Sequence, residues 1–226
     1  MKVLILINKV GLGDCIIHLN YIHEISKKYE KPVSILAKEN TRAKDLFQDD
    51  PHIKEVITLD RLEDETGSHD GLKGFIKLIK DIKEKKFDKV FIFNSSVRYF
   101  LVCKFAGIKK IAQYPLFKKK GQHVVNTAKI FTENEIDKIV STQPKLFVNQ
   151  DKILKAQKKM SFNNKCIVLG ISASGPTKRW EIKNFIKLSE KINQKFPSKF
   201  YLAAGKNDQP LICLLYTSPS PRDVSR

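Results

Sequence analysis

The opening residues place a short apolar strand directly before a glycine-bearing turn and a helix. Residues 3–7 read Val-Leu-Ile-Leu-Ile, an unbroken apolar run typical of a strand buried on both faces of a parallel sheet. Residues 8–14, Asn-Lys-Val-Gly-Leu-Gly-Asp, follow, and residues 14–29 carry apolar side chains at helical spacing. In open α/β folds such a unit borders the crevice in which ligands bind. The first 30 residues therefore favour a doubly wound α/β domain.

The rest of the chain continues this alternation. We expect strands at 33–37, 56–59, 90–93 and 111–113, and helices at 41–47, 72–85 and 97–106. A polar, lysine-rich stretch, our candidate hinge, runs from Pro144 to Asn164. A strand at 166–169, a helix at 182–196 and a strand at 200–204 then follow. This order implies a right-handed parallel crossover. The sequence thus predicts an α/β protein with one Rossmann-like domain at 1–150 and the start of a second at 151–212.

The last residues differ in character from the rest. Residues 213–223, Cys-Leu-Leu-Tyr-Thr-Ser-Pro-Ser-Pro-Arg-Asp, look like a sequencing adapter translated in frame. We therefore expect 213–226 to be a non-native read-through tail and exclude it from fold reasoning. On that interpretation the native sequence stops near Ile212. We then expect the second domain to be incomplete and this fragment to be inactive.

Charge and composition limit the class of protein. The formal net charge of +18 suits acidic partners such as nucleic acid, anionic lipid or phosphorylated small molecules. The lysines are spread along the chain, so the charge alone names no partner. No apolar run approaches the roughly 18 residues that span a bilayer, and the first run is too short for a secretory signal. The four cysteines are widely spaced, which excludes a disulfide framework or a zinc site. We expect a cytoplasmic protein.

The first turn places a carboxylate at the start of a helix. Gly11 and Gly13 suggest a dinucleotide fingerprint, but Ile16 occupies the position of its third glycine. No Gly-Lys-Ser/Thr sequence follows, which excludes a P-loop. Asp14 falls in the first helical turn, where the helix dipole favours a negative charge. It is either a helix cap or a general base for a substrate hydroxyl, and spacing alone leaves both open.

The second turn has the composition of a phosphate cradle. Residues 170–180 read Gly-Ile-Ser-Ala-Ser-Gly-Pro-Thr-Lys-Arg-Trp. The hydroxyls of Ser172, Ser174 and Thr177, with backbone N–H groups and Lys178 at a helix start, suit a phosphate group. A polar loop with a helix cap is the alternative. We expect Trp180 to pack near the helix start. The chain has no Asp-x-Asp pair to hold a cation on a diphosphate, so we predict no metal site.

Together, these two turns resemble the heptosyltransferase family, the glycosyltransferases that add heptose from ADP-heptose to the lipopolysaccharide core. Near its N-terminus the family has an apolar strand and a loop ending in Gly-Asp, here Gly13 and Asp14. In its second domain a strand precedes small hydroxyl residues, then Lys, a basic or polar residue, and Trp. Here these are Ser174 and the run Lys-Arg-Trp at 178–180. The resemblance covers essentially all of the native segment.

The resemblance implies a GT-B fold, with two Rossmann-like domains facing each other across a cleft. It also implies an inverting, metal-independent transfer that needs no cofactor beyond the nucleotide-sugar donor, ADP-heptose. Asp14 would be the general base. Lys9, Gly11 and Gly13 would form the acceptor-side loop, while Ser174, Thr177 and Lys178 would hold the donor diphosphate. The chain departs from the family at Asn8, where several relatives carry a basic residue, so the acceptor stays open.

The partners implied are a nucleotide sugar and a glycolipid acceptor, with the protein a monomer. The lysine-rich outer face of the helix at 72–85 is compatible with peripheral contact to an anionic inner membrane. Two alternatives compete. A Rossmann-type oxidoreductase would need the third glycine that Ile16 replaces. A basic nucleic-acid-binding protein would need cations interleaved with exposed aromatic side chains, whereas the Phe and Tyr residues fall mostly in apolar strands and helix faces.

Overall fold

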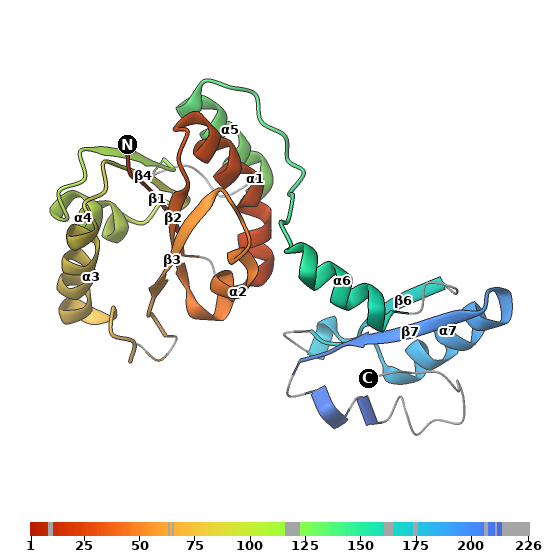
Figure 1. Cartoon of the computed structure of the whole chain (residues 1–226). Coiled ribbons are helices and arrows are strands. Elements are labelled where there is room, and N and C mark those ends of the chain that lie inside the picture. Colours follow the sequence, from red (N-terminus) through yellow and green to blue (C-terminus); the bar gives the residue numbers. More distant parts are fainter. Residues whose placement is uncertain are drawn as a thin grey trace. The chain divides into compact units, whose positions relative to one another are not determined.

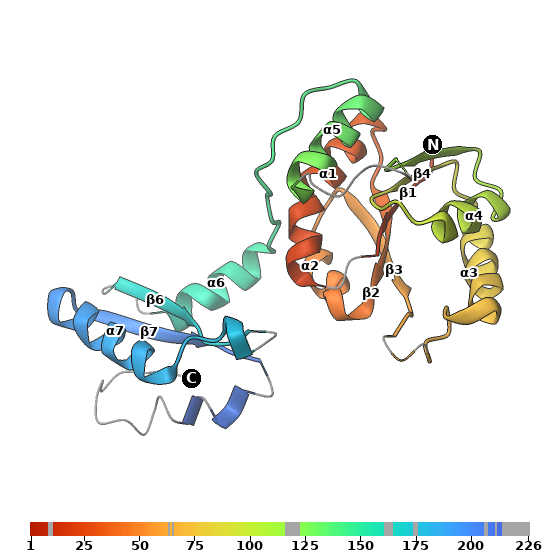
Figure 2. The same cartoon turned by 180° about the vertical axis from the view of Figure 1, so that it is seen from behind.

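The chain forms two compact units, Met1–Val148 and Asn149–Arg226 (Figures 1 and 2). The computed structural model describes residues 1–8, 11–62, 64, 66–115, 123–160, 165–173, 176–205, 208–210 and 212–213. Every helix in these ranges is too short or too polar to cross a membrane.

The first unit is built on a five-stranded parallel sheet in the order β3-β2-β1-β4-β5. The strands are β1 (Val3–Ile7), β2 (Val33–Lys38), β3 (Ile53–Leu59), β4 (Lys89–Ile92) and β5 (Lys110–Gln113). Ile5 at the centre of the sheet pairs with Ile35 on one side and Phe91 on the other. The chain winds outward from β1 to β3 and then returns to add β4 and β5. The strand order therefore reverses between β1 and β4, the point at which open α/β sheets bind ligands.

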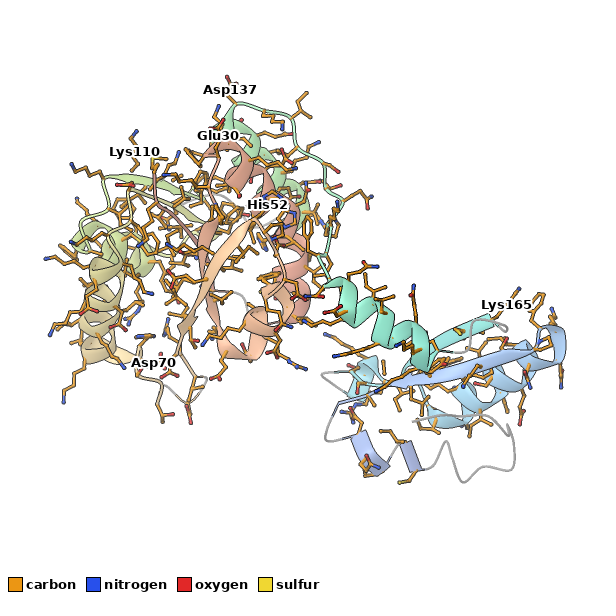
Figure 3. All side chains as sticks on the ribbon, in the orientation of Figure 1. Glu30, His52, Asp70, Lys110, Asp137 and Lys165 are labelled. Carbon is orange, nitrogen blue, oxygen red and sulfur yellow. The ribbon has the colours of Figure 1, made fainter. Side chains whose placement is uncertain are left out.

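Helices cover both faces of this sheet, as both views of the ribbon show (Figures 1 and 2). One face carries α1 (Leu12–Lys28), α2 (Ala43–Phe47) and α5 (Val124–Ile136), and the other carries α3 (Gly71–Lys85) and α4 (Val97–Phe105). A short 3-10 turn, η1 (Glu39–Thr41), precedes α2. Val3, Ile5 and Ile7 pack into the first layer, whereas Leu4 and Leu6 pack into the second. Figure 3 shows the side chains on the ribbon in the same orientation as Figure 1. The apolar run at 3–7 is thus buried on both faces, as predicted.

The helix α5 was not expected from the sequence. Its fully buried positions, Ala128, Thr132 and Ile136, lie four residues apart and include a small and a polar side chain. Such a narrow stripe gives little hydrophobic periodicity. The helix is held against α1, where the Tyr21 hydroxyl donates a hydrogen bond to the Val125 carbonyl oxygen at 2.9 Å. Tertiary packing therefore supports a helix that has only a weak local signal.

The second unit begins with a helix inside the polar stretch from Pro144 to Asn164. This helix, α6 (Gln150–Lys159), has no buried residue, and the Asn149 side chain caps it by accepting from the Asp151 N–H at 2.8 Å. The strand β6 (Lys165–Gly170), the 3-10 turn η2 (Pro176–Lys178), the helix α7 (Ile182–Lys195) and the strand β7 (Ser198–Ala203) follow. The two strands are parallel, which confirms the predicted crossover. Leu169, Ile171, Phe185 and Phe200 form their core.

Candidate functional site

Asp14 lies in the first turn of α1, directly after the central strand β1. Gly11, extended at φ −131°, is the N-cap, and its N–H donates to Asp14 Oδ2 at 3.2 Å. The Asp14 N–H in turn donates to the Gly11 carbonyl oxygen at 3.1 Å. With these two hydrogen bonds Asp14 caps the start of the helix, which is one of the two roles that the sequence left open. The carboxylate is only half-buried, so the cap leaves it accessible to a ligand.

The other residues of this loop differ in what surrounds them. A Cβ atom added at Gly13 would meet nothing within 4 Å, and one at Gly11 would lie 3.4 Å from Asp14 Oδ2. Packing within this unit therefore leaves room for a Cβ atom at both positions. Lys9, the third residue predicted for the acceptor-side loop, lies outside the described residues.

The turn that follows β4 and the last residue of β5 supply polar groups at the same edge of the sheet as Asp14. Gln113 Nε2 donates to the carbonyl oxygens of Asn94 at 3.1 Å and Ser96 at 3.0 Å, and the Ser96 N–H donates to Asn94 Oδ1 at 2.9 Å. In the described part of the chain, the buried Asn94 Nδ2 has no hydrogen-bond partner. These residues carry no motif, so no sequence signal groups them.

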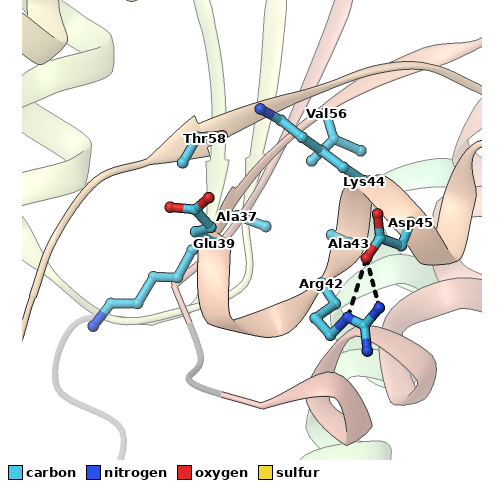
Figure 4. A pocket seen from close by; sticks show the side chains of 9 residues that line it. Ala37, Glu39, Arg42, Ala43, Lys44, Asp45, Val56 and Thr58 are labelled. Atoms are coloured by element: carbon cyan, nitrogen blue, oxygen red, sulfur yellow. Dashed lines mark hydrogen bonds and ion pairs between the residues drawn. The ribbon is translucent and has the colours of Figure 1, made fainter. Parts of the chain in front are cut away.

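A pocket of about 260 Å³ opens at the carboxyl ends of β2 and β3 (Figure 4). It is lined by Ala37, Lys38, Glu39, Arg42, Ala43, Lys44, Asp45, Val56 and Thr58. Arg42 Nε and Nη2 lie 3.1 and 2.9 Å from Asp45 Oδ2, as the dashed lines show. That carboxylate therefore neutralises Arg42, whereas no ion pair holds Lys38 or Lys44 among the described residues. Lys38 and Lys44 thus offer cations to a polar, negatively charged ligand, while Glu39 adds a carboxylate to the same lining.

The second turn lies in the second unit, between β6 and α7. Thr177 and Lys178 are exposed, and no hydrogen bond or ion pair engages their side chains in the described ranges. Ser174 lies outside the described residues. Ser172, which the sequence grouped with them, instead donates its hydroxyl hydrogen to the Asp208 carboxylate. Of the predicted phosphate cradle, Thr177 and Lys178 are thus the described side chains available to a ligand.

Trp180 packs at the start of α7, as expected. Its ring meets Phe185 edge-on, with centroids 5.0 Å apart, and 51% of the residue remains exposed. No cluster of three or more metal-binding side chains (His, Cys, Asp or Glu) occurs in the described ranges.

The open parallel sheet in this strand order and the second parallel β-α-β unit give the chain an α/β fold of the GT-B type, which solved structures share. The chain belongs to glycosyltransferase family 9 (heptosyltransferase), whose sequence model matches residues 75–215. Family membership decides in favour of the glycosyltransferase over the oxidoreductase and the nucleic-acid-binding protein. No curated protein sequence matches the chain.

Solved structures share the fold at low sequence identity. A glycosyltransferase of family 9 from Veillonella parvula DSM 2008 has a TM-score of 0.78 at 15% identity, over 99% of this chain and 68% of that chain. The E. coli ADP-heptose lipopolysaccharide heptosyltransferase II has a TM-score of 0.72 at 17% identity, over 97% and 69%. The E. coli heptosyltransferase WaaC with ADP-2-deoxy-2-fluoro heptose has a TM-score of 0.63 at 11% identity, over 96% and 74%.

Proposed function

We propose that this chain is an inverting, metal-independent glycosyltransferase that transfers heptose from ADP-heptose to a lipopolysaccharide-core-type acceptor. The observation that carries the proposal is the Asp14 carboxylate, fixed by Gly11 at the start of α1 and at the carboxyl end of the central strand. Membership of family 9 supports the reaction class. The donor is suggested by E. coli WaaC, solved with ADP and with an ADP-heptose analogue.

In this proposal Asp14 acts on the acceptor. A sugar hydroxyl is a weak nucleophile until a base removes its proton, and a carboxylate within hydrogen-bond reach can do so as the new bond forms. The hydrogen bond from the Gly11 N–H to Oδ2 holds the carboxylate in one orientation. A base held in this way loses little freedom when the acceptor binds.

The second turn would act on the donor. As the bond between the sugar and the phosphate breaks, negative charge builds on the departing nucleoside diphosphate. Lys178, the Thr177 hydroxyl and Ser174 would stabilise that charge together with backbone N–H groups. Residues 1–150 would then form the acceptor side and residues 151–212 the beginning of the donor side.

The pocket beside β2 and β3 suits the acceptor in this scheme. Lys38 and Lys44 line it without an ion-pair partner among the described residues, so they would attract anionic groups on a core oligosaccharide. A glycolipid acceptor also brings the protein to a bilayer. Leu72 and Ile76, four residues apart on α3, are 83% and 55% exposed and lie among exposed lysines. This face suits peripheral contact with anionic lipid.

The experiment compares Asp14→Asn with the wild-type chain. ADP release is measured with ADP-heptose and a heptose-deficient lipopolysaccharide, in the presence of EDTA. We expect turnover to fall by about 10²–10⁴-fold, the usual contribution of a general base. Asp137→Asn is the control, because Asp137 is an exposed cap of α5 at φ +53°, a conformation that asparagine tolerates. The proposal requires turnover by the wild-type chain, a result that would overturn the sequence-based expectation that this fragment is inactive. No turnover by the wild-type chain, wild-type turnover in Asp14→Asn, or loss of activity with EDTA would contradict the proposal.

A further inference from the structure

Side chains join the two turns that follow the strands of the second unit. Gly170 lies opposite Ala203 in the parallel pair, so both turns leave the same edge, and the Ile171 N–H donates to the Ala203 carbonyl oxygen at 3.1 Å. Beyond this point Ser172 Oγ donates to Asp208 Oδ2. The Gly205 N–H is shared between Ser172 Oγ at 2.8 Å and Asp208 Oδ2 at 3.0 Å.

Arg179 extends this network to the far end of the first turn. Its Nε donates to the Ala173 carbonyl oxygen at 3.2 Å, and its Nη2 lies 3.6 Å from Asp208 Oδ1. Asp208 is 6% exposed, so its carboxylate is largely enclosed by these partners. Asp208 thus engages Ser172 and Arg179, which flank Thr177 and Lys178 in the sequence.

The surroundings of Asp208 favour a charged, closely fitted carboxylate. The hydrogen bond from Ser172 lowers the pKa of Asp208, burial raises it, and the Gly205 N–H and the Arg179 charge lower it further, with a net lowering. A Cβ atom at Gly205 would lie 3.0 Å from Asp208 Oδ2 and 3.6 Å from Ser172 Oγ. The second turn therefore passes close to the carboxylate, and a larger residue at 205 would crowd it.

We propose that Asp208 is a positioning residue for the donor diphosphate, because it holds Ser172 and Arg179 and so fixes the segment that presents Lys178. This inference rests on the proposed function, which places the diphosphate at this turn. Asp208 itself has no need to touch the ligand. Its charge alone would repel phosphate, so loss of that charge without loss of position would strengthen ADP binding. Loss of position would weaken it, and the two effects have opposite signs.

The test measures ADP binding to the full chain by calorimetry. We expect Asp208→Asn and Ser172→Ala each to raise the Kd for ADP about tenfold, because hydrogen bonds to a charged group are lost. Asp208→Glu, which keeps the charge, is expected to recover part of the affinity. Glu181→Gln is the matched control. It removes the same charge outside the network, since Glu181 pairs with Lys183 on the surface at 2.5 Å. ADP binding by Asp208→Asn as tight as wild type, or tighter, would overturn the inference.

Trp180 supplies a second readout that does not depend on ADP. It is the one tryptophan of the chain and follows Arg179 directly. We expect acrylamide to quench its fluorescence more strongly in Asp208→Asn and Ser172→Ala than in wild type or Glu181→Gln, with circular dichroism confirming the fold. If the wild-type chain fails to bind ADP, the proposed function fails at this turn, and quenching then tests only whether the network orders this segment. Unchanged quenching in both network variants would reject it.

Discussion

His23 and Asp50 form a buried pair that ties α1 to the turn before β3. Nε2 of His23 lies 2.7 Å from Oδ2 of Asp50, and the two side chains are 4% and 1% exposed. The other carboxylate oxygen of Asp50 accepts the His52 N–H at 2.9 Å. The rings of His23 and His52 lie 4.8 Å apart, and both contact Phe147 edge-on. One carboxylate thus organises a cluster of aromatic and imidazole rings.

Replacing Asp50 by alanine should destabilise the first unit. The buried His23 imidazole and the His52 N–H would both lose their acceptor, so we expect the free energy of unfolding to fall by about 2 kcal/mol. Urea denaturation followed by circular dichroism measures this. Asp45→Asn, which breaks the exposed pair with Arg42, should cost less than about 1 kcal/mol. Equal stability of Asp50→Ala and wild type would show that the cluster adds nothing.

The same cluster should make stability depend on pH. Burial lowers the pKa of His52, and the positive charges of His23 and Lys27 lower it further, against the raising effect of Asp50 and Glu24. The unfolded chain then binds more protons than the folded chain below about pH 6.5, so stability falls as the pH drops through that value. Denaturation midpoints between pH 8 and pH 6 measure the slope. His52→Gln should flatten it, and an unchanged slope would refute this origin.

Gly74 should not tolerate a side chain. A Cβ atom there would lie 2.2 Å from the carbonyl carbon of His69 and 2.6 Å from its Cα, so α3 or the preceding turn would have to move. We expect Gly74→Ala to cost about 2 kcal/mol of stability, as overpacking does. Thermal unfolding measures this, and a Gly74→Ala variant that melts with wild type would contradict the close approach of α3 to residue 69.

Gly13 should behave in the opposite way. It lies in the first turn of α1 and a Cβ atom would meet nothing, so Gly13→Ala should keep or raise stability by up to about 1 kcal/mol through helix propensity. If Gly13 borders the acceptor, as the family resemblance implies, ADP release should still fall with a raised acceptor KM. Full activity in a stable Gly13→Ala variant would remove Gly13 from the acceptor side.

The buried cysteines should resist thiol reagents. Burial raises the pKa of the Cys103 thiol to about 12, and burial, with a smaller contribution from Asp14, raises that of Cys15 against a hydrogen bond with Thr41. Because the thiolate is the reactive form, both should label far more slowly than the exposed Cys213. Mass spectrometry after timed alkylation, with and without urea, checks this. Rapid labelling of Cys103 in the native chain would be inconsistent with its burial.

Local patterns predicted the elements whose character is set over a few residues. The apolar run at 3–7 required burial on both faces, and the helices on the two faces of the sheet provide it. Gly13 and Asp14 marked a helix start because capping involves neighbours in sequence. Helices α5 and α6 escaped prediction, since one buries only a narrow stripe and the other buries nothing. The amphipathic signal was therefore weak in α5, and in α6 no buried face accompanied it.

Local sequence patterns were enough to specify the α/β class, the central strand and the two turns that resemble a heptosyltransferase. Which distant side chains meet depended on the three-dimensional packing. His23 pairs with Asp50 across 27 residues, and Ser172 bonds to Asp208 across 36. The packing also engages the Ser172 hydroxyl with Asp208, while Thr177 and Lys178 are exposed. Hydrogen bonds require placement to within a fraction of an ångström, and strand register and helix packing, rather than local periodicity, set that placement.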